Sequence, residues 1–343
     1  MASSRGGFFR HQGRVVALAM LFAIAGCRES GRDAKAPSHV LAGRAMGTTW
    51  RVVLRSAEVD AKALQTGTSA LLEELESKLS HWRADSEVSR FNRAGAGVPV
   101  PVSAETARVV LFGEEMRAAS GGAFDIRVAG RVAARGFGPK ALVRDAPAPD
   151  APGGSITVHL TPPSLTKSKA GLVIDLSAYA KGHAVDRIAG FLEGKNIQHY
   201  LVEVGGEIKA RGANAKGKPW SAGVEAPVPE RREIHLLVRL KNEAIATSGN
   251  YRIFRKEVDG SIQSHLVDPR DGGTGEPAFR SVSVIASETM NADAWATALY
   301  VLGEVAGLQM AKERGLAVCF LRVSDGGEVE EKMTAGFRER VIP

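Results

Sequence analysis

The stretch "AGLVIDLSAYAKGHAVDRIAGFLEGKN", residues 170–196, combines a strand and a helix in one run. Its first part is apolar and β-branched, which is typical of a buried strand. Its second part has an apolar stripe at steps of three and four residues, which predicts an amphipathic helix. The stripe consists of Val185, Ile188, Ala189 and Leu192. Gly194 or Asn196 would end this helix.

The rest of the chain continues this mixture of elements. We expect a hairpin around Met46-Gly47 and an irregular, Pro- and Gly-rich stretch at 131–169, read as surface loop with a short strand at 155–160. Apolar periodicity predicts helices at 60–80, 103–119, 290–303 and 303–314. Strands are predicted at 199–204, 207–211, 219–224, 233–240, 244–247, 262–267, 281–286 and around Cys319. Because no strict βαβ repeat appears, the pattern favours an α+β fold, with mixed sheets flanked by helices, over a doubly wound sheet.

The N-terminus has the pattern of a targeting signal. Three arginines precede an apolar run of eleven residues, Val15–Ala25, which is too short to cross a bilayer and fits a secretory signal. The run ends in "IAGC", which resembles a bacterial lipoprotein signal that is cut before Cys27, whose thiol is then lipidated. An ordinary signal followed by a chance cysteine is the alternative. We expect residues 1–26 to be the signal, 27–38 a tether and 39–343 the functional domain, held at a membrane outside the cytoplasm.

Composition narrows the function classes. The formal net charge is +7, and no block of Lys and Arg is interleaved with aromatic residues, so we do not expect a nucleic-acid partner. The chain has two cysteines, too few for a zinc site of the CxxC kind. With Cys27 expected to carry lipid, Cys319 is predicted to be a small core residue.

The helix start "MNADAWATALYVLG", residues 290–303, carries two polar residues on an apolar background. Asp293 and Thr297 are four apart and therefore share one helix face. One interpretation is helix capping, because Asp is favourable near a helix start. The other is a pair of hard oxygen ligands for a cation.

Two further stretches place polar groups at the ends of apolar runs. In "GGAFD", residues 121–125, Phe124 and Asp125 could begin a strand, or could form an aromatic platform with an acceptor beside a ligand. In "DLSAYAKGHAVD", residues 175–186, Asp175 ends a strand and Lys181 lies in the first turns of a helix. Lys181 there suits a phosphate, or is a surface lysine, and His183 is expected at the surface.

Three more stretches contain glycines within β patterns: "EVGGEIKARG" (203–212), "IATSGNYR" (245–252) and "SHLVDPRDGG" (264–273). No GxGxxG or Walker motif occurs, which disfavours those two nucleotide-binding folds. His265 and Val267 project from one face of a strand, and a histidine at a strand end can accept a proton, although a structural role is the alternative. A hydrolase triad is rejected because the chain lacks a GxSxG elbow.

These stretches, in this order, together with "AMGTTW", "WRADSEVSRFN" and "ADAWATAL", resemble the FAD:protein FMN transferase family, the ApbE-type flavin transferases. The resemblance covers about residues 40–305. It implies an α/β body that binds FAD and Mg²⁺ in a cleft and transfers FMN through a phosphoester to a Thr of a target protein, with release of AMP. Targets of the family are typically flavoprotein subunits of membrane redox complexes.

The resemblance also implies roles for single residues. The Mg²⁺ ligands would be the side chains of Asp293 and Thr297 and the carbonyl of Ala178, with a further contact from Ala296. The FAD pocket would be lined by Met46, Trp82, Ala123, Phe124, Asp125, Asp175, Lys181, His265 and Val267. His265 would take the proton from the attacking Thr hydroxyl. Two alternatives stay open: an FAD pyrophosphatase that gives FMN and AMP, and a non-catalytic FAD-binding lipoprotein.

The chain departs from the family pattern at a few positions. Glu203 and Val204 stand where Asn or Asp is expected, and Arg135 stands where the family often has Trp. Tyr179 is bulkier than the aliphatic residue that usually follows Ala178. None of these positions supplies an expected metal-binding side chain.

Overall fold

One antiparallel sheet of eight strands organises the fold, in the order β1-β2-β6-β7-β10-β13-β14-β15. The computed structural model describes residues 37–56, 59–139, 153–229, 231–256, 262–273 and 279–343. The predicted signal and Cys27 lie outside these residues. The strands are β1 (Ser38–Ala45), β2 (Thr48–Arg55), β6 (Tyr200–Val204), β7 (Glu207–Arg211), β10 (Ala244–Gly249), β13 (Arg280–Ala286), β14 (Ala317–Val323) and β15 (Val329–Met333). Every neighbouring pair is antiparallel, which confirms the α+β prediction.

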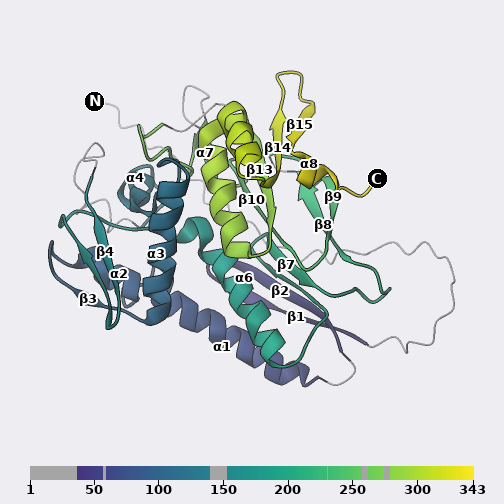
Figure 1. Ribbon diagram of the computed structural model, residues 1–343, viewed down its shortest axis with the longest axis horizontal. Coiled ribbons are helices and arrows are strands. Elements are labelled where there is room, and N and C mark those ends of the chain that lie inside the picture. Colours follow the sequence, from purple (N-terminus) through teal and green to yellow (C-terminus); the bar gives the residue numbers. More distant parts are fainter. Residues whose placement is uncertain (1–36, 57–58, 140–152, 230, 257–261, 274–278) are drawn as a thin grey trace, which may run out of the picture. The chain divides into compact units, whose positions relative to one another are not determined.

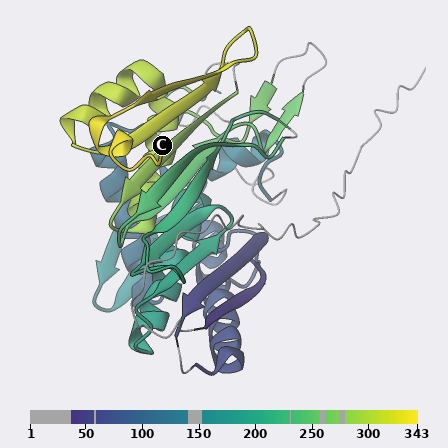
Figure 2. The same cartoon turned by 90° about the vertical axis from the view of Figure 1, so that its right-hand side faces the viewer.

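The sheet is buried on both faces. Along β13 and β14, alternate residues point to opposite sides, so Val284 and Val318 join one core while Ile285 and Cys319 join the other. Cys319 is a buried free thiol, as predicted. Helices α1 (Ala61–Leu79), α6 (Ser177–Gly194) and α7 (Thr289–Glu313) cover the first face, and β8 (Trp220–Glu225), β9 (Ile234–Leu240) and α8 (Ala335–Arg338) cover the second (Figures 1 and 2).

A smaller group of elements lies beside α1 and α6 (Figure 1). It contains α2 (Glu87–Arg93), α3 (Ala104–Ala119), η1 (Ile126–Val128), α4 (Ala129–Ala134) and the sheet of β3 (Val100–Pro101), β5 (Pro163–Lys167) and β4 (Ile156–Leu160). The hairpin of β11 (Phe254–Lys256) and β12 (Ile262–Ser264) stands apart from the main sheet. The expectation of loop around the 155–160 strand was wrong at β5, because Leu160 pairs with Pro163 and Thr161-Pro162 form a two-residue hairpin turn.

The helix predicted within 170–196 forms as α6, but the strand predicted before it was wrong: residues 171–176 form no strand, so Asp175 precedes α6 in an irregular segment. The ends of α6 and of the first half of α7 follow the sequence. Asn196 has a left-handed φ of 60°, and the Ile197 amide donates to the Leu192 carbonyl at 3.0 Å, which closes α6. Gly303 has φ 77° and ψ 174° and breaks α7 into two helical parts, which confirms the two predicted helices that meet at 303. The strand predicted at 262–267 is shorter, and β12 ends one residue before His265.

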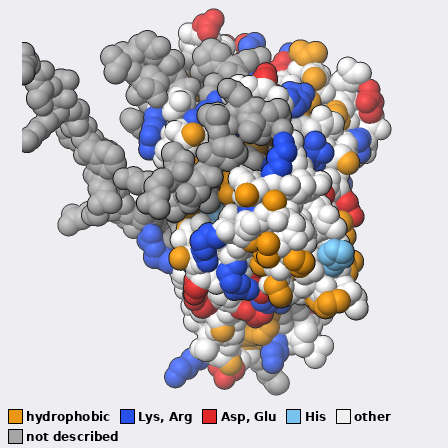
Figure 3. All heavy atoms as spheres, turned by 90° about the vertical axis from the view of Figure 1, so that its left-hand side faces the viewer, with side chains coloured by type: hydrophobic (Ala, Val, Ile, Leu, Met, Phe, Trp, Pro, Cys, Tyr) orange, Lys and Arg blue, Asp and Glu red, His pale blue; other side chains and the backbone are white. Residues whose placement is uncertain are grey.

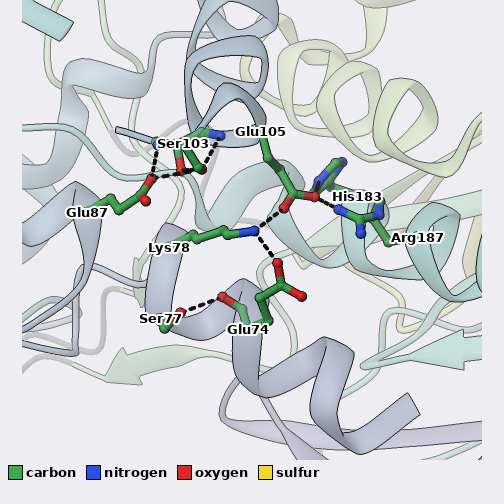
Figure 4. A network of polar contacts seen from close by, with 9 residues as sticks. Glu74, Ser77, Lys78, Glu87, Ser103, Glu105, His183 and Arg187 are labelled. Atoms are coloured by element: carbon green, nitrogen blue, oxygen red, sulfur yellow. Dashed lines mark hydrogen bonds and ion pairs between the residues drawn. The ribbon is translucent and has the colours of Figure 1, made fainter. Parts of the chain in front are cut away.

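A buried charged cluster joins three helices (Figure 4). Glu105 of α3 pairs with Lys78 of α1 at 2.8 Å, and with His183 at 3.0 Å and Arg187, both of α6. The prediction that His183 lies at the surface was wrong, because α3 covers that side of α6. Burial lowers the pKa of the His183 ring to about 4.

The surface is mixed in character on the face that Figure 3 shows. There, the Lys and Arg side chains of the described residues are interspersed with acidic and apolar ones. In the described part of the chain, the helices are all too short or too polar to cross a membrane.

Candidate active site

The first turns of α6 and α7 meet at Gly182. A Cβ atom at Gly182 would lie 2.6 Å from the Thr289 carbonyl oxygen, so only glycine permits this approach. The Gly182 amide donates to Asp293 Oδ2 at 3.0 Å. In a regular helix the same amide would donate to the carbonyl of Ala178. The contact therefore joins Asp293 to the helical turn that begins at Ala178, whose carbonyl is an expected ligand of the metal.

Asp293 does not cap its own helix. The capping role belongs to Asp186 of α6, whose carboxylate accepts from the Thr289 and Met290 amides at 2.9 Å each. Asp186 also contacts Lys209 at 3.0 Å. The capping interpretation of Asp293 is therefore wrong, and its carboxylate, only 3 % exposed, faces α6 instead.

Thr297 lies one turn further along the same face of α7. Its hydroxyl is 2.9 Å from the hydroxyl of Ser248, at the end of β10. Ser248 belongs to the "IATSGNYR" turn, so this stretch reaches the predicted metal site through Thr297. Ala296 is fully buried and its methyl side chain offers no ligand atom, so its contact with the metal stays a prediction.

Lys181 extends from α6 toward the turn between β6 and β7. Its ammonium pairs with Glu207 at 2.5 Å. The turn residue Gly205 has φ 64°, and a Cβ there would lie 2.9 Å from the Thr48 side chain and 3.1 Å from Cδ of Lys181. The Gly-Gly pair thus lets the chain pass close to Lys181. Glu207 was not predicted as a site residue, because its partner is 26 residues away.

Burial governs the charges at this point of the fold. It raises the pKa of Asp293 to about 8, partly opposed by Lys181, and it also raises the pKa of Glu207. Burial lowers the pKa of Lys181, but Glu207 and Asp293 outweigh this effect and the net direction is upward. The second oxygen of Glu207, Oε2, is buried without a hydrogen-bond partner among the described residues. The charges of Glu207 and Asp293 thus both act on the ammonium of Lys181, and Glu207 pairs with it directly.

The donor set fits a hard divalent cation. Asp293, Thr297 and the Ala178 carbonyl offer a carboxylate, a hydroxyl and a carbonyl oxygen, the ligand types that Mg²⁺ prefers. Among the residues that the structure describes, no three His, Cys, Asp or Glu side chains form a metal-binding group. A site of few protein ligands is the kind that Mg²⁺ occupies together with substrate phosphate oxygens.

His265 follows β12 and has a defined tautomer. Its Nδ1 lies 3.1 Å from the carbonyl oxygen of Ile253. Because a carbonyl only accepts, Nδ1 carries the hydrogen, which leaves Nε2 as the basic nitrogen of the neutral ring. Burial lowers the pKa of His265, and the charge of Lys181 acts in the same direction. The positive charge of Lys181 therefore acts on the ring of His265, although the two residues come from distant segments of the chain.

Two further predicted pocket residues, Asp175 and Trp82, both contact His81. His81 Nδ1 contacts Asp175 Oδ1 at 3.0 Å, and the Ser177 amide donates to the same oxygen at 2.8 Å. Burial raises the pKa of Asp175, but these two partners outweigh it and the net shift is downward. The Trp82 ring, 5.4 Å from that of His81, is 62 % exposed and open to a planar ligand. His81 was not predicted as a site residue.

The remaining predicted pocket residues serve the packing of the protein. Phe124 is buried, with its ring 5.5 Å from that of Tyr179, and Asp125 pairs with Arg117 and Arg127 at 3.0 and 2.8 Å. Ala123 and Val267 are also buried, and Met46, in the turn between β1 and β2, has φ 51°. Their contacts with FAD stay predictions.

An open hollow on the protein surface lies elsewhere. It is lined by Glu304, Val305, Leu308 and Lys332, among others, and covers the second half of α7. It contains none of the residues above. The chemistry of the buried charges, and not the size of a surface hollow, therefore marks the candidate site.

Comparisons with known proteins identify the class of this protein. The sequence pattern of the ApbE family matches residues 46–320. The chain therefore belongs to the ApbE family.

Similar proteins cover nearly the whole chain. It is 36% identical to the FAD:protein FMN transferase of Vibrio cholerae, over 91% of this chain and 94% of that protein. It is 34% identical to the FAD:protein FMN transferase of Haemophilus influenzae, over 94% and 95%. The solved flavin transferase ApbE of Vibrio cholerae is 32% identical with a TM-score of 0.76, over 89% and 100%. The apo flavinyl transferase ApbE of Pseudomonas stutzeri is 31% identical with a TM-score of 0.77, over 89% and 96%.

Proposed function

We propose that this protein is an FAD:protein FMN transferase that depends on Mg²⁺. The contact between the Gly182 amide and Asp293 carries the proposal, because it joins α6, the helix of Ala178, to the part of α7 that holds Asp293 and Thr297. Relatives with this activity in their names match more than nine-tenths of the chain. FAD donates the FMN group, and a Thr of a target flavoprotein accepts it. We propose that this target is a subunit of a membrane redox complex.

The reaction replaces the phosphoanhydride bond of the FAD pyrophosphate by a phosphoester bond to the Thr. The Thr oxygen forms a bond to the phosphorus of the FMN half, and the bond from that phosphorus to the bridging oxygen breaks, so that AMP leaves. Nε2 of His265 accepts the Thr proton, which the neutral ring can do. Lys181 places a positive charge where the phosphates would lie.

The metal would be held by Asp293, Thr297 and the Ala178 carbonyl. When bound, Mg²⁺ would neutralise charge on the pyrophosphate, which favours departure of AMP. Ser248 orients the Thr297 hydroxyl at 2.9 Å. Trp82, with its exposed ring, and Asp175 would support binding of the flavin nucleotide.

The main competing activity is hydrolysis of FAD to FMN and AMP. The same residues would serve it, with water in place of the Thr hydroxyl. A protein that only holds FAD is a weaker alternative, since simple binding does not need a neutral histidine with a free basic nitrogen beside the phosphates. The products distinguish the three activities. A transferase gives a protein adduct, a pyrophosphatase gives free FMN, and a protein that only binds FAD leaves it intact.

The location is proposed from the sequence. The basic and apolar residues of 1–26 and the "IAGC" run support a lipoprotein anchored through a diacylated, N-acylated Cys27. The catalytic domain would then lie outside the cytoplasm, joined to the membrane by a short tether.

Replacement of Asp293 tests the metal assignment. Asp293→Ala should abolish Mg²⁺-dependent turnover, because it removes the only charged ligand of the proposed set. Asp60→Ala is the matched control, since Asp60 caps α1 and has no part in the site. Turnover is measured as AMP release against Mg²⁺ concentration. Unchanged turnover of Asp293→Ala would refute the assignment, provided that Asp60→Ala is also active.

A further inference from the structure

The charge of the Lys181 ammonium is attracted by two buried carboxylates, Glu207 and Asp293. It pairs with Glu207 at 2.5 Å, while the adjacent residue, Gly182, donates its amide to Asp293. Glu207 and Asp293 are each 3 % exposed. Both carboxylates raise the pKa of Lys181, so both attract its charge.

Only one of these carboxylates is expected to bind the metal. A lysine side chain has four flexible carbons and a compact charge that can change partner. If the ammonium paired with Asp293, it would occupy the oxygen that the cation needs. The partner of Lys181 therefore decides whether Asp293 stays available.

We propose that Glu207 is a positioning residue that holds the Lys181 ammonium away from Asp293 and so keeps Asp293 open to the divalent cation. The inference rests on the proposed function, in which Asp293 is a metal ligand. It extends that function by giving a role to a residue that does not touch the metal.

The surroundings of Glu207 support a fixed role. Glu207 begins β7, directly after the Gly205-Gly206 turn, so its backbone is set by the sheet. Gly205 of this turn lies close to both the Thr48 side chain and the stem of Lys181, since a Cβ there would meet both. The lysine is thus guided toward Glu207 by packing as well as by charge.

The test measures how tightly the full-length protein, without FAD, binds Mn²⁺, which serves as a probe of the divalent cation site. Free Mn²⁺ is quantified by its electron paramagnetic resonance signal. Glu207→Gln removes the charge and keeps the shape. We expect it to weaken Mn²⁺ binding roughly tenfold or more, the range found for residues that support metal ligands. Glu203→Gln is the matched control, because Glu203 accepts from the Gly206 amide at 2.8 Å and is not bonded to Lys181.

A double variant separates positioning from general damage. In Lys181→Met with Glu207→Gln, no ammonium remains to occupy Asp293, so Mn²⁺ affinity should return to within about threefold of the unsubstituted protein. The double variant also replaces both members of a buried pair, which proteins tolerate better than the loss of one member. Glu207→Asp, which keeps the charge, should bind Mn²⁺ better than Glu207→Gln.

Three results would overturn the inference: equal Mn²⁺ affinity in Glu207→Gln and the unsubstituted protein, equal weakening by Glu203→Gln, or a double variant as weak as Glu207→Gln. FMN transfer by the unsubstituted protein is measured in parallel. Absent transfer with the expected order of Mn²⁺ affinities would refute the proposed activity and leave the role of Glu207 standing. No Mn²⁺ binding by the unsubstituted protein would refute both.

Discussion

At the scale of single residues, burial sets the chemistry of the site. His265 keeps a neutral ring because burial and Lys181 both lower its pKa, and Ile253 fixes its tautomer. A base with a lowered pKa loses its proton at a more acidic pH than free histidine does. The proton acceptor is therefore ready over a wider range of pH.

The pH dependence of transfer follows from this shift. Since only the neutral ring accepts a proton, kcat/KM should fall on the acid side with a midpoint below about 6.5, the ordinary value for histidine. The measurement uses saturating Mg²⁺, so that the proton on Asp293 does not limit the rate. In His265→Ala this limb should vanish and transfer should slow by roughly 10²–10⁴-fold, with little change in FAD binding. A midpoint above 6.5, or equal losses in transfer and FAD binding, would refute the role of His265.

Sequence could indicate some of these residues and not others. Asp293 and Thr297 stood out because they are polar on an apolar helix, and His265 because it ends a strand. Asp186, His81 and Glu207 act through partners on other elements, namely Thr289, Asp175 and Lys181. Such contacts between distant segments leave no local pattern, so only the fold reveals them.

At the scale of elements, Gly303 shapes the helix that carries the metal ligands. The backbone there, φ 77° and ψ 174°, belongs to a region that is almost exclusive to glycine. The break ends the rigid part of α7 that holds Asp293 and Thr297, and the second half takes a new direction. A residue with a side chain would be strained in this backbone conformation.

Two Gly→Ala changes should have opposite effects. Gly303→Ala should lower the free energy of unfolding by about 1–3 kcal/mol, because alanine is strained in this conformation. Gly190→Ala, on an exposed position inside α6 with open space around it, should raise it by about 0.5–1 kcal/mol, because alanine favours the helix. Urea unfolding of both variants provides the measurement. A Gly303→Ala protein as stable as the unsubstituted one would contradict the structure of α7.

Periodic elements were the ones that sequence could predict. The long helices α1, α3, α6 and α7 follow apolar stripes, and their observed bounds agree with the predicted ranges within a few residues. The short α2, in a mixed polar and aromatic stretch, and β5, within a proline-rich stretch, were missed. Their structure depends on neighbours such as β4, which supplies the hydrogen bonds of β5.

At the scale of the whole molecule, packing between distant segments holds the site in place. The strand order joins β2 to β6 and β7 to β10, pairs that lie far apart in the sequence. No local pattern specifies this order, although the α+β class could be predicted. The cluster around Glu105 fixes α1 and α3 against α6, the helix that carries Lys181 (Figure 4).

Glu105 should therefore matter more than a surface glutamate with the same partner. Glu105→Gln should lower the free energy of unfolding by about 1–3 kcal/mol, because Lys78 and Arg187 lose the carboxylate charge that they share. Glu74→Gln is the matched control: Glu74 also pairs with Lys78, but its side chain is half exposed, and the change should stay within about 0.5 kcal/mol. If urea unfolding gave equal losses of unfolding free energy for the two variants, the cluster around Glu105 would not hold α1 and α3 against α6.

The most direct test of the central claim is mass spectrometry of an acceptor protein. The purified chain is mixed with FAD, Mg²⁺ and a flavoprotein domain whose acceptor Thr is intact or replaced by Val. We predict the gain of one FMN on the Thr form only, with release of AMP, and loss of the product when EDTA is added. Free FMN and AMP without an adduct would contradict the transferase assignment and favour a pyrophosphatase. FAD that stays intact and bound would show that the protein is a carrier.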